Sequence, residues 1–235
     1  MIIIFDNSIE RYFCNCIHRY FSQIKLILCY WNTIDLKKEI DINNYRQLWN
    51  IYSFDLNDCN KYNLKFNKLF FPVHNDNINQ RFEIKQDVIF VGKNKGRIAE
   101  IVKILNEFDK IGILYKIICP DADNLKNDKI INKRISYDEV LAEDMNSRAI
   151  LDINGNDIYG MTMRELEALF LKKKLITNNI MIKNRDYYHP DNVYIIDYTN
   201  TPLLRGFKDF LEKPFVPVND DVMNSYSVES WSRRF

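Results

Sequence analysis

Short apolar runs alternate with amphipathic segments along most of the chain, and this alternation limits the possible folds more than any other feature. The apolar runs of the first half are rich in isoleucine, leucine and aromatic residues, as buried strands are. They cover residues 2–5, 25–31, 48–54 and 66–71. Residues 8–23 carry apolar side chains at helical spacing, and Asp55 or Asn57 is expected to open a helical turn over residues 58–63.

The same alternation is clearer in the second half. Residues 87–91 form a continuous apolar run, and residues 97–110 repeat apolar side chains at helical spacing up to Gly112. Further strands are expected over residues 113–119, 149–153 and 174–177, and further helices over residues 137–147 and 163–172. Strands that alternate with helices of this length favour parallel sheets covered on both faces, so we expect an α/β fold.

A polar, aperiodic stretch at residues 73–84 separates the two halves and is expected to be a linker. We therefore expect two Rossmann-like domains with parallel sheets, of which the N-terminal one is shortened. The first would span residues 1–80 and the second residues 85–220. Residues 221–235 contain several aromatic side chains and are expected to form a C-terminal helix that packs back on the body.

Bulk composition argues against several classes of protein. The 33 basic and 32 acidic side chains nearly cancel, and the net charge of +1 does not indicate a nucleic-acid binder. The five cysteines lack the paired spacing of a zinc site, and they fit a reducing cytoplasm. No apolar run approaches the roughly 20 residues that span a bilayer, and the N-terminus lacks a signal-peptide pattern. We expect a cytoplasmic protein, in contact with the inner face of the membrane at most peripherally.

One loop has the chemistry of a phosphate site. In an open parallel sheet, ligands bind at the carboxyl ends of the strands, and residues 92–97 (GKNKGR) follow a predicted strand and open a predicted helix. Gly92 lets the backbone approach an anion, the helix N-terminus adds positive potential, and Lys93, Lys95 and Arg97 supply cations. An ordinary surface turn with solvated lysines explains the same residues. The loop is neither a Walker sequence nor a dinucleotide fingerprint.

A second loop leads to a helix start at Thr162, because a glutamate three residues later completes the spacing of a capping box. The free amides of this turn, around Gly160 and Met161, are expected to face a diphosphate. Arg164 then suits phosphate oxygens, and Glu167 suits the two vicinal hydroxyls of a ribose. An intrahelical ion pair on the surface explains Arg164 and Glu167 equally well, because they are three residues apart.

A third loop, residues 133–137, also precedes a predicted helix. Its backbone, with the apolar side chain of Ile135 and with Tyr137, is expected to hold a nucleobase. A plain helix start capped by Ser136 explains this loop as well.

Taken together, these segments resemble bacterial glycosyltransferases of lipopolysaccharide and capsule assembly. The matching stretches of the second half are DVIFVGKNKGR (87–97), AILDI (149–153), GMTMRELEAL (160–169), KKLITNN (173–179) and YSVESW (226–231). In the first half, YWN (30–32) and YSFDLNDCNKY (52–62) resemble the acceptor-side domain of that group. The resemblance covers most of the chain and rests on the order and spacing of these stretches.

The resemblance implies a GT-B fold, a hexosyltransferase-like activity and a nucleoside diphosphate sugar as donor, with no cofactor and no metal ion. The acceptor would be a growing surface glycan, free or lipid-linked. Asp6 and Asn32, each at the end of a predicted strand, are the candidates for a catalytic base. Retaining members of this group carry two glutamates eight residues apart. Glu167 is similar to the second, but Tyr159 stands at the place of the first, so retention or inversion stays open.

Two other functions fit the same residues. A non-catalytic subunit would use this fold to bind a nucleotide or a partner enzyme. A related GT-B enzyme would transfer a polyol phosphate in place of a sugar. The short N-terminal half and Tyr159 favour the subunit, because both suggest an incomplete site.

Overall fold

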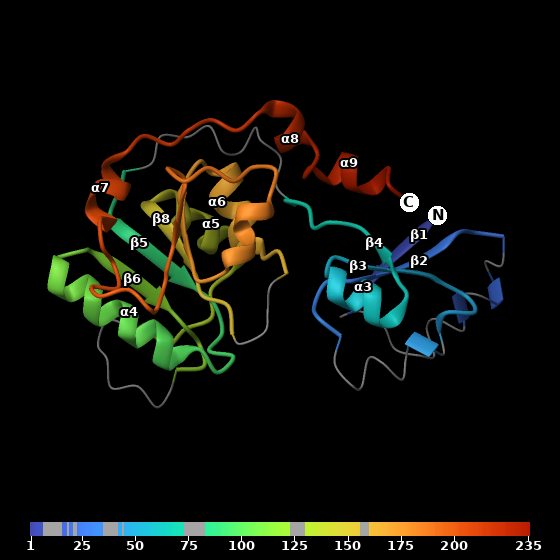
Figure 1. Ribbon diagram of the computed structural model, residues 1–235. Helices are drawn as coiled ribbons and strands as arrows, with labels where there is room; N and C mark the ends of the chain where they lie inside the picture. The colour runs from blue at the N-terminus through green and yellow to red at the C-terminus, as the bar shows by residue number, and fades with distance from the viewer. Residues whose placement is uncertain are drawn as a thin grey trace. The chain divides into compact units, whose positions relative to one another are not determined.

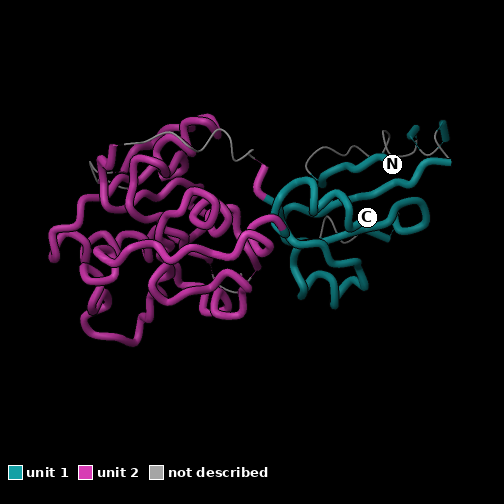
Figure 2. The backbone as a smooth tube through the Cα atoms, turned by 90° about the horizontal axis from the view of Figure 1, so that it is seen from above, with its two compact units in different colours: residues 1–70, 225–235 teal, residues 71–224 magenta. Residues whose placement is uncertain are grey.

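The computed structural model describes residues 1–6, 16–17, 19–20, 23–34, 42–43, 45–72, 83–122, 130–155 and 160–235. The chain divides into two compact units, shown in two colours in Figure 2. Unit 1 consists of residues 1–70 and 225–235, and unit 2 consists of residues 71–224. Each unit is built on a parallel sheet, so the expected α/β class is confirmed. Residues 73–82 of the expected linker lie outside the described residues.

The described part of unit 1 contains a four-stranded parallel sheet in the order β1-β2-β3-β4 (Figure 1). The strands are β1 (Ile2–Phe5), β2 (Leu26–Tyr30), β3 (Asn50–Ser53) and β4 (Lys65–Phe66). Strand β2 is buried along its whole length, because apolar side chains cover both of its faces. Helix α3 (Leu56–Tyr62) is opened by Asp55, whose carboxylate accepts from the backbone N–H groups of Asn57 and Asp58. The helix expected over residues 8–23 lies mostly outside the described residues.

The strand expected over residues 66–71 is wrong for most of its length. Only Lys65–Phe66 pairs with β3. The chain leaves the sheet at Asn67, whose side-chain amide donates to the Trp231 carbonyl at 3.4 Å. The apolar side chains that follow are nevertheless buried: Phe70 packs on Trp231 with ring centroids 4.5 Å apart, in a cluster that includes Ile27 and Cys29 of β2. An apolar run therefore predicted burial correctly but strand pairing incorrectly.

The C-terminal segment forms two short helices in place of the single helix expected. They are α8 (Asp220–Asn224) and α9 (Val228–Ser232). Ser227 separates them, because its backbone is extended and its hydroxyl accepts from the backbone N–H of Ser230 at 3.2 Å, which starts a new helix. In α9, Trp231 stacks on Phe5 at 5.7 Å and is buried in the core of unit 1.

The described part of unit 2 contains a six-stranded parallel sheet in the order β10-β9-β8-β5-β6-β7. Its strands are β5 (Gln86–Val91), β6 (Tyr115–Ile118), β7 (Ile130–Ile131), β8 (Ser147–Asp152), β9 (Lys174–Thr177) and β10 (Val193–Ile195). Its helices are α4 (Ile98–Ile111), α5 (Tyr137–Met145), α6 (Met163–Phe170), α7 (Phe207–Glu212) and the 3-10 helix η3 (Ile180–Asn184). The strands and helices expected between residues 87 and 177 are all present, with ends that differ by at most two residues.

Helices cover both faces of the sheet of unit 2 (Figure 1). Alternate side chains of a strand point to opposite faces of the sheet, so a strand with apolar side chains at every position needs cover on both sides. On one face, Val88 and Phe90 of β5 pack with Ile101 and Phe108 of α4 and with Phe207 of α7. Helices α5 and α6 contact each other and β8. The loops at the carboxyl ends of the strands lie along one edge of the sheet. In open parallel sheets, this is the edge where ligands bind.

Candidate functional site

Strands β5 and β8 are parallel neighbours, so the loops that follow them lie side by side at the carboxyl edge of the sheet. The Arg97 side chain joins the two loops. Its Nη1 donates to the Ile153 carbonyl of the second loop, and its Nε and Nη2 donate to the Lys93 carbonyl at 3.1 and 3.0 Å. The geometric condition for one shared phosphate site, that both loops belong to neighbouring strand ends, is therefore met.

Arg97 is a half-buried brace between these loops. A Cβ atom at Gly92 would lie 2.7 Å from Arg97 Nη2, so a larger residue at position 92 would require the end of the arginine side chain to move. The guanidinium also lies 5.1 Å from the centre of the Phe90 ring. Burial lowers the pKa of the Arg97 guanidinium, and the nearby Asp152 carboxylate opposes that shift.

The lysines of the first loop differ from Arg97 in their exposure. Lys93 and Lys95 are both exposed. Lys95 and Gly96 have left-handed backbones, with φ of 45° and 80°, which turn the chain into α4. Asn94 Oδ1 accepts from the backbone N–H of Ile98 at 3.1 Å and so begins the helix. The two ammonium groups are more accessible to solvent or to a phosphate than the half-buried Arg97 guanidinium.

Thr162 caps α6 as expected, but the complete capping box is wrong. In a complete box, the Glu165 carboxylate would accept a hydrogen bond from the backbone N–H of Thr162. The Thr162 hydroxyl accepts from the backbone N–H of Glu165 at 3.2 Å and donates to Asp152 Oδ2 at 2.7 Å. The Glu165 carboxylate does not return the bond. It accepts from Tyr187 Oη at 2.7 Å and from Arg185 Nε at 3.2 Å. A charged guanidinium and a phenol are stronger partners for a buried carboxylate than one backbone amide.

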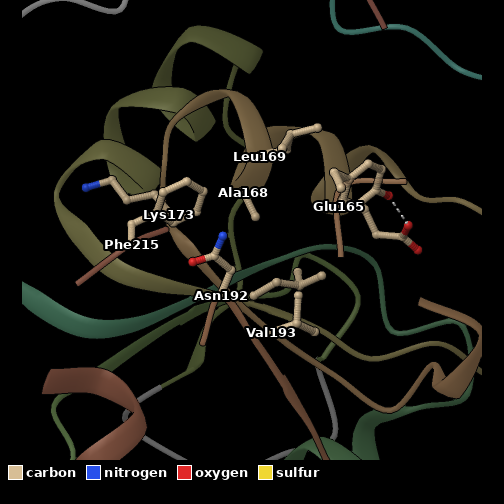
Figure 3. A pocket seen from close by; sticks show the side chains of 9 residues that line it. Glu165, Ala168, Leu169, Lys173, Asn192, Val193 and Phe215 are labelled. Atoms are coloured by element: carbon tan, nitrogen blue, oxygen red, sulfur yellow. Dashed lines mark hydrogen bonds between the residues drawn. The ribbon is translucent and has the colours of Figure 1, made fainter. Parts of the chain in front are cut away.

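Glu165 lines a small cavity together with residues of α6, β9 and β10 (Figure 3). The cavity has a volume of about 20 Å³, and Leu169, Lys173, Asn192 and Phe215 also line it. This volume accommodates one water molecule, so the cavity is too small for a nucleotide. Burial raises the pKa of the Glu165 carboxyl to about 7, although the Arg185 guanidinium lowers it.

Arg164 and Glu167 do form an intrahelical ion pair, but the expectation that it lies on the surface is wrong. The Arg164 side chain is 11% exposed and the Glu167 side chain 2%. Arg164 also binds Asp144 of α5 through two parallel hydrogen bonds of 3.0 and 2.9 Å. Two carboxylates therefore share one guanidinium. Burial raises the pKa of Asp144 to about 7, and the charge of Arg164 opposes this shift.

Tyr137, the first residue of α5, lies close enough to Glu167 for the two groups to interact electrostatically. Burial and the charge of Glu167 raise the pKa of the Tyr137 hydroxyl. Oε2 of Glu167 is buried and lies in ion-pair contact with Arg164 Nη2. That ion pair fixes the position of the Glu167 carboxylate.

The third loop begins α5 with a complete capping box between Ser136 and Glu139, so the capped helix start is confirmed. Ile135 is half-buried, and Tyr137 is 39% exposed. The loop therefore presents one half-buried apolar side chain and one partly exposed aromatic residue.

Two asparagines that the sequence reasoning missed hold the second loop. Asn178 makes two hydrogen bonds with the backbone of Asn154, of 2.8 and 2.9 Å, and Asn179 Nδ2 donates to the Gly160 carbonyl at 3.4 Å. Their position directly after a predicted strand was a signal that could have found them. Met161 is buried beside this turn. Tyr159 lies outside the described residues.

Asp6 and Asn32 belong to unit 1, whereas the expected donor-binding residues belong to unit 2. Asp6 Oδ1 accepts from the backbone N–H of Trp31 at 2.9 Å and so ties the ends of β1 and β2 together. Asn32 follows Trp31 and is half-buried. Both candidates therefore lie at the carboxyl edge of the sheet of unit 1.

The described residues of the two units contain no group of three or more His, Cys, Asp or Glu side chains that could hold a metal ion. Over the same part of the chain, no helix is long and apolar enough to cross a membrane.

No family model and no curated protein matches this sequence. The fold, however, is shared with solved structures. TarM is similar over 89% of this chain and 49% of its own, with 13% identity and a TM-score of 0.56. A UDP-forming α,α-trehalose-phosphate synthase from Burkholderia xenovorans is similar over 95% of this chain and 70% of its own, with 10% identity and a TM-score of 0.56. The chain spans about half the length of TarM, and its two parallel sheets give it a GT-B-like, Rossmann-type fold.

Proposed function

We propose that the protein is a GT-B glycosyltransferase that moves a sugar from a nucleoside diphosphate sugar to a surface glycan of the lipopolysaccharide or capsule type. One observation carries the proposal. Two loops with phosphate-binding chemistry meet at neighbouring strand ends, where the Arg97 side chain joins them. The fold shared with TarM and with the trehalose-phosphate synthase supports this proposal.

The diphosphate of the donor would lie over the loops that follow β5 and β8. Lys93 and Lys95 are exposed there, and helices α4 and α6 both begin at this edge. The first N–H groups of a helix have no partner within the helix, and in α6 the Thr162 hydroxyl satisfies only the N–H of Glu165. The other amides of that first turn supply donors and positive potential for an anion. A diphosphate can accept hydrogen bonds from these donors, and its negative charge is attracted by the positive potential.

The ribose of the donor would bind Glu167, because a carboxylate accepts hydrogen bonds from two vicinal hydroxyls. Arg164 then acts on the ribose site indirectly. Its guanidinium is engaged by Asp144 and Glu167, so it holds the Glu167 carboxylate in place and is not free to turn toward a phosphate. The base would lie against the third loop, where Ile135 supplies an apolar contact and the backbone supplies hydrogen bonds.

Transfer then requires one substitution at the anomeric carbon of the donor sugar. A hydroxyl oxygen of the acceptor bonds to that carbon while its bond to the diphosphate oxygen breaks, and the diphosphate leaves with the electron pair. Lys93, Lys95 and the amides of α6 would stabilise the charge on the leaving group, so the chemistry does not call for a divalent cation. Asp6 is our candidate to take the proton of the acceptor, and Asn32 to orient the acceptor hydroxyl.

A panel of UDP-, GDP- and ADP-sugars tests the proposal by two measurements, titration calorimetry of the nucleoside diphosphate and donor turnover in EDTA. We expect one diphosphate to bind and its sugar donor to be consumed. Replacing Lys93 and Lys95 by alanine should weaken diphosphate binding on the order of tenfold or more, because charged hydrogen bonds are lost. The matched control replaces the exposed Lys103 and Lys208 of the same unit and should bind like wild type.

Three outcomes would contradict the proposal at different levels. If no nucleoside diphosphate binds, unit 2 is not a donor site. Binding without turnover of any donor would support a non-catalytic subunit, and turnover only of a nucleotide-linked polyol would support transfer of a polyol phosphate.

A further inference from the structure

One guanidinium lies between two carboxylates in the interior of unit 2. Nη1 and Nη2 of Arg164, on α6, donate to the two carboxylate oxygens of Asp144, on α5, at 3.0 and 2.9 Å. Glu167, three residues further along α6, meets the same guanidinium through Oε2 at Nη2. The side chains of Asp144, Arg164 and Glu167 are 0%, 11% and 2% exposed, so water competes little for these contacts.

The two carboxylates bind this guanidinium in different ways, and the difference affects Glu167. A guanidinium binds a carboxylate most strongly when two N–H groups meet both carboxylate oxygens. If Glu167 bound Arg164 in that way, both of its oxygens would face the guanidinium and fewer of its lone pairs would remain for hydroxyls. Asp144 takes the two-bond pairing in its place. A residue of α5 thus influences how much of a carboxylate on α6 is open to a ligand.

We propose that Asp144 is a positioning residue of the donor site: by binding Nη1 and Nη2 of Arg164, it prevents a two-bond pair between Arg164 and Glu167 and leaves the Glu167 carboxylate able to accept ribose hydroxyls. This inference rests on the proposed function and adds to it a residue that acts through Arg164 and does not itself touch the donor. The effect of Asp144 should therefore be confined to ligands that carry ribose hydroxyls.

The surrounding contacts allow Asp144 to be tested by substitution. Next to it on α5, the Met145 carbonyl accepts from Lys173 Nζ at 2.7 Å, a bond that does not depend on the Asp144 charge. In Asp144→Asn, Arg164 still has Glu167 as a charged partner. An asparagine offers one acceptor oxygen in place of two, so the two-bond pair with Asp144 is lost and the guanidinium is free to form one with Glu167.

Titration calorimetry of wild type and Asp144→Asn with three ligands tests the inference. UDP, GDP and ADP are compared on wild type, and the one that binds most tightly is used with its 2′-deoxyribose analogue and with pyrophosphate. Asp144→Asn should bind the nucleoside diphosphate about three- to tenfold more weakly, within the coupling range of contacting residues. The analogue, which lacks one of the two hydroxyls, should lose less, and pyrophosphate, which has no ribose, should bind both proteins alike.

Glu143→Gln is the matched control, because it changes the preceding residue of α5 in the same way. It removes the ion pair between Glu143 Oε1 and Lys116 Nζ, which are 2.5 Å apart. This variant should have a lower melting temperature and an unchanged affinity for all three ligands. If Asp144→Asn does not fold, Asp144→Ser replaces it: it also lacks the carboxylate, its smaller side chain leaves room for water beside Arg164, and the same ribose-dependent loss is expected.

Unchanged nucleotide affinity in the Asp144 variant would overturn the inference, and so would an equal loss for pyrophosphate or for the deoxyribose analogue. If wild type binds the nucleotide and Glu167→Gln weakens that binding, such a result leaves the proposed function standing. Absence of nucleoside diphosphate binding by wild type would overturn both.

Discussion

Replacing Glu167 by glutamine tests the donor site most directly, because it removes one charge and keeps the length of the side chain. If Glu167 accepts hydrogen bonds from both ribose hydroxyls, the variant loses the charged acceptor. Hydrogen bonds to charged groups contribute roughly 1.5–3 kcal/mol, so affinity for the nucleoside diphosphate should fall about tenfold to a hundredfold. A 2′-deoxyribose analogue should bind wild type weakly and should lose less on mutation, because one of its two bonds is already absent.

The structure also predicts a cost to the free protein, which an exposed pair would not show. The Arg164–Glu167 pair is buried, and breaking a buried pair typically costs about 3–5 kcal/mol. Here Asp144 still pairs with Arg164 through two hydrogen bonds, and burial raises the pKa of Glu167, which already disfavours its charge. We therefore expect a smaller loss, about 1–2 kcal/mol, by denaturant unfolding.

Calorimetry with both ligands and both proteins gives the double difference. Unchanged nucleotide affinity together with reduced stability would make Glu167 a purely structural residue and would refute its assignment to the ribose. The converse result, weaker binding of the ribonucleotide and a smaller loss for the deoxyribose analogue, is the one that the site requires.

Other substitutions test the loops, the buried acids and unit 1. Gly92→Ala should displace Arg97 and weaken diphosphate binding, whereas Gly155→Ala should be tolerated, because its Cβ would meet its nearest neighbour at an ordinary 3.7 Å; calorimetry compares the two. Burial raises the pKa of Glu165 to about 7 in the folded protein, so between about pH 4.5 and pH 7 the folded state holds a proton that the unfolded state has lost. The free energy of unfolding should therefore fall as the pH rises through this range, and urea unfolding should show a shallower fall in Glu165→Gln. Trp231→Ala should destabilise unit 1 by about 3–5 kcal/mol in thermal unfolding, and a smaller loss would mean that its ring stacking contributes little.

Local patterns predicted the helices and strands of unit 2 well, because their periodicity and caps lie within a few residues of sequence. Helix α4 ends at Gly112, whose left-handed backbone (φ 68°) a glycine adopts readily, and β9 has the expected ends. Short edge strands such as β7 and β10 were not predicted, because two or three residues carry no periodicity.

Partners that are distant in sequence could not be predicted in this way. The threonine–glutamate spacing at Thr162 matched a capping box, yet Glu165 binds Arg185 and Tyr187 about 20 residues later. No sequence pattern indicates that Asp144 pairs with Arg164, because this contact exists only once α5 and α6 pack together. Packing of helices on a sheet thus decides which side chains are buried as pairs, and a single sequence does not contain that information in readable form.

The same packing shows why the two interpretations of Arg164 and Glu167 need not exclude each other. An ion pair and a ligand site compete only if they use the same lone pairs. Here the guanidinium is shared between Asp144 and Glu167, and it holds Glu167 in place through ion-pair contact with Oε2. A carboxylate has about four lone-pair sites on its two oxygens, so one ion pair does not use all of them. In the proposed donor site, the ribose hydroxyls would therefore add to the ion pair without replacing it.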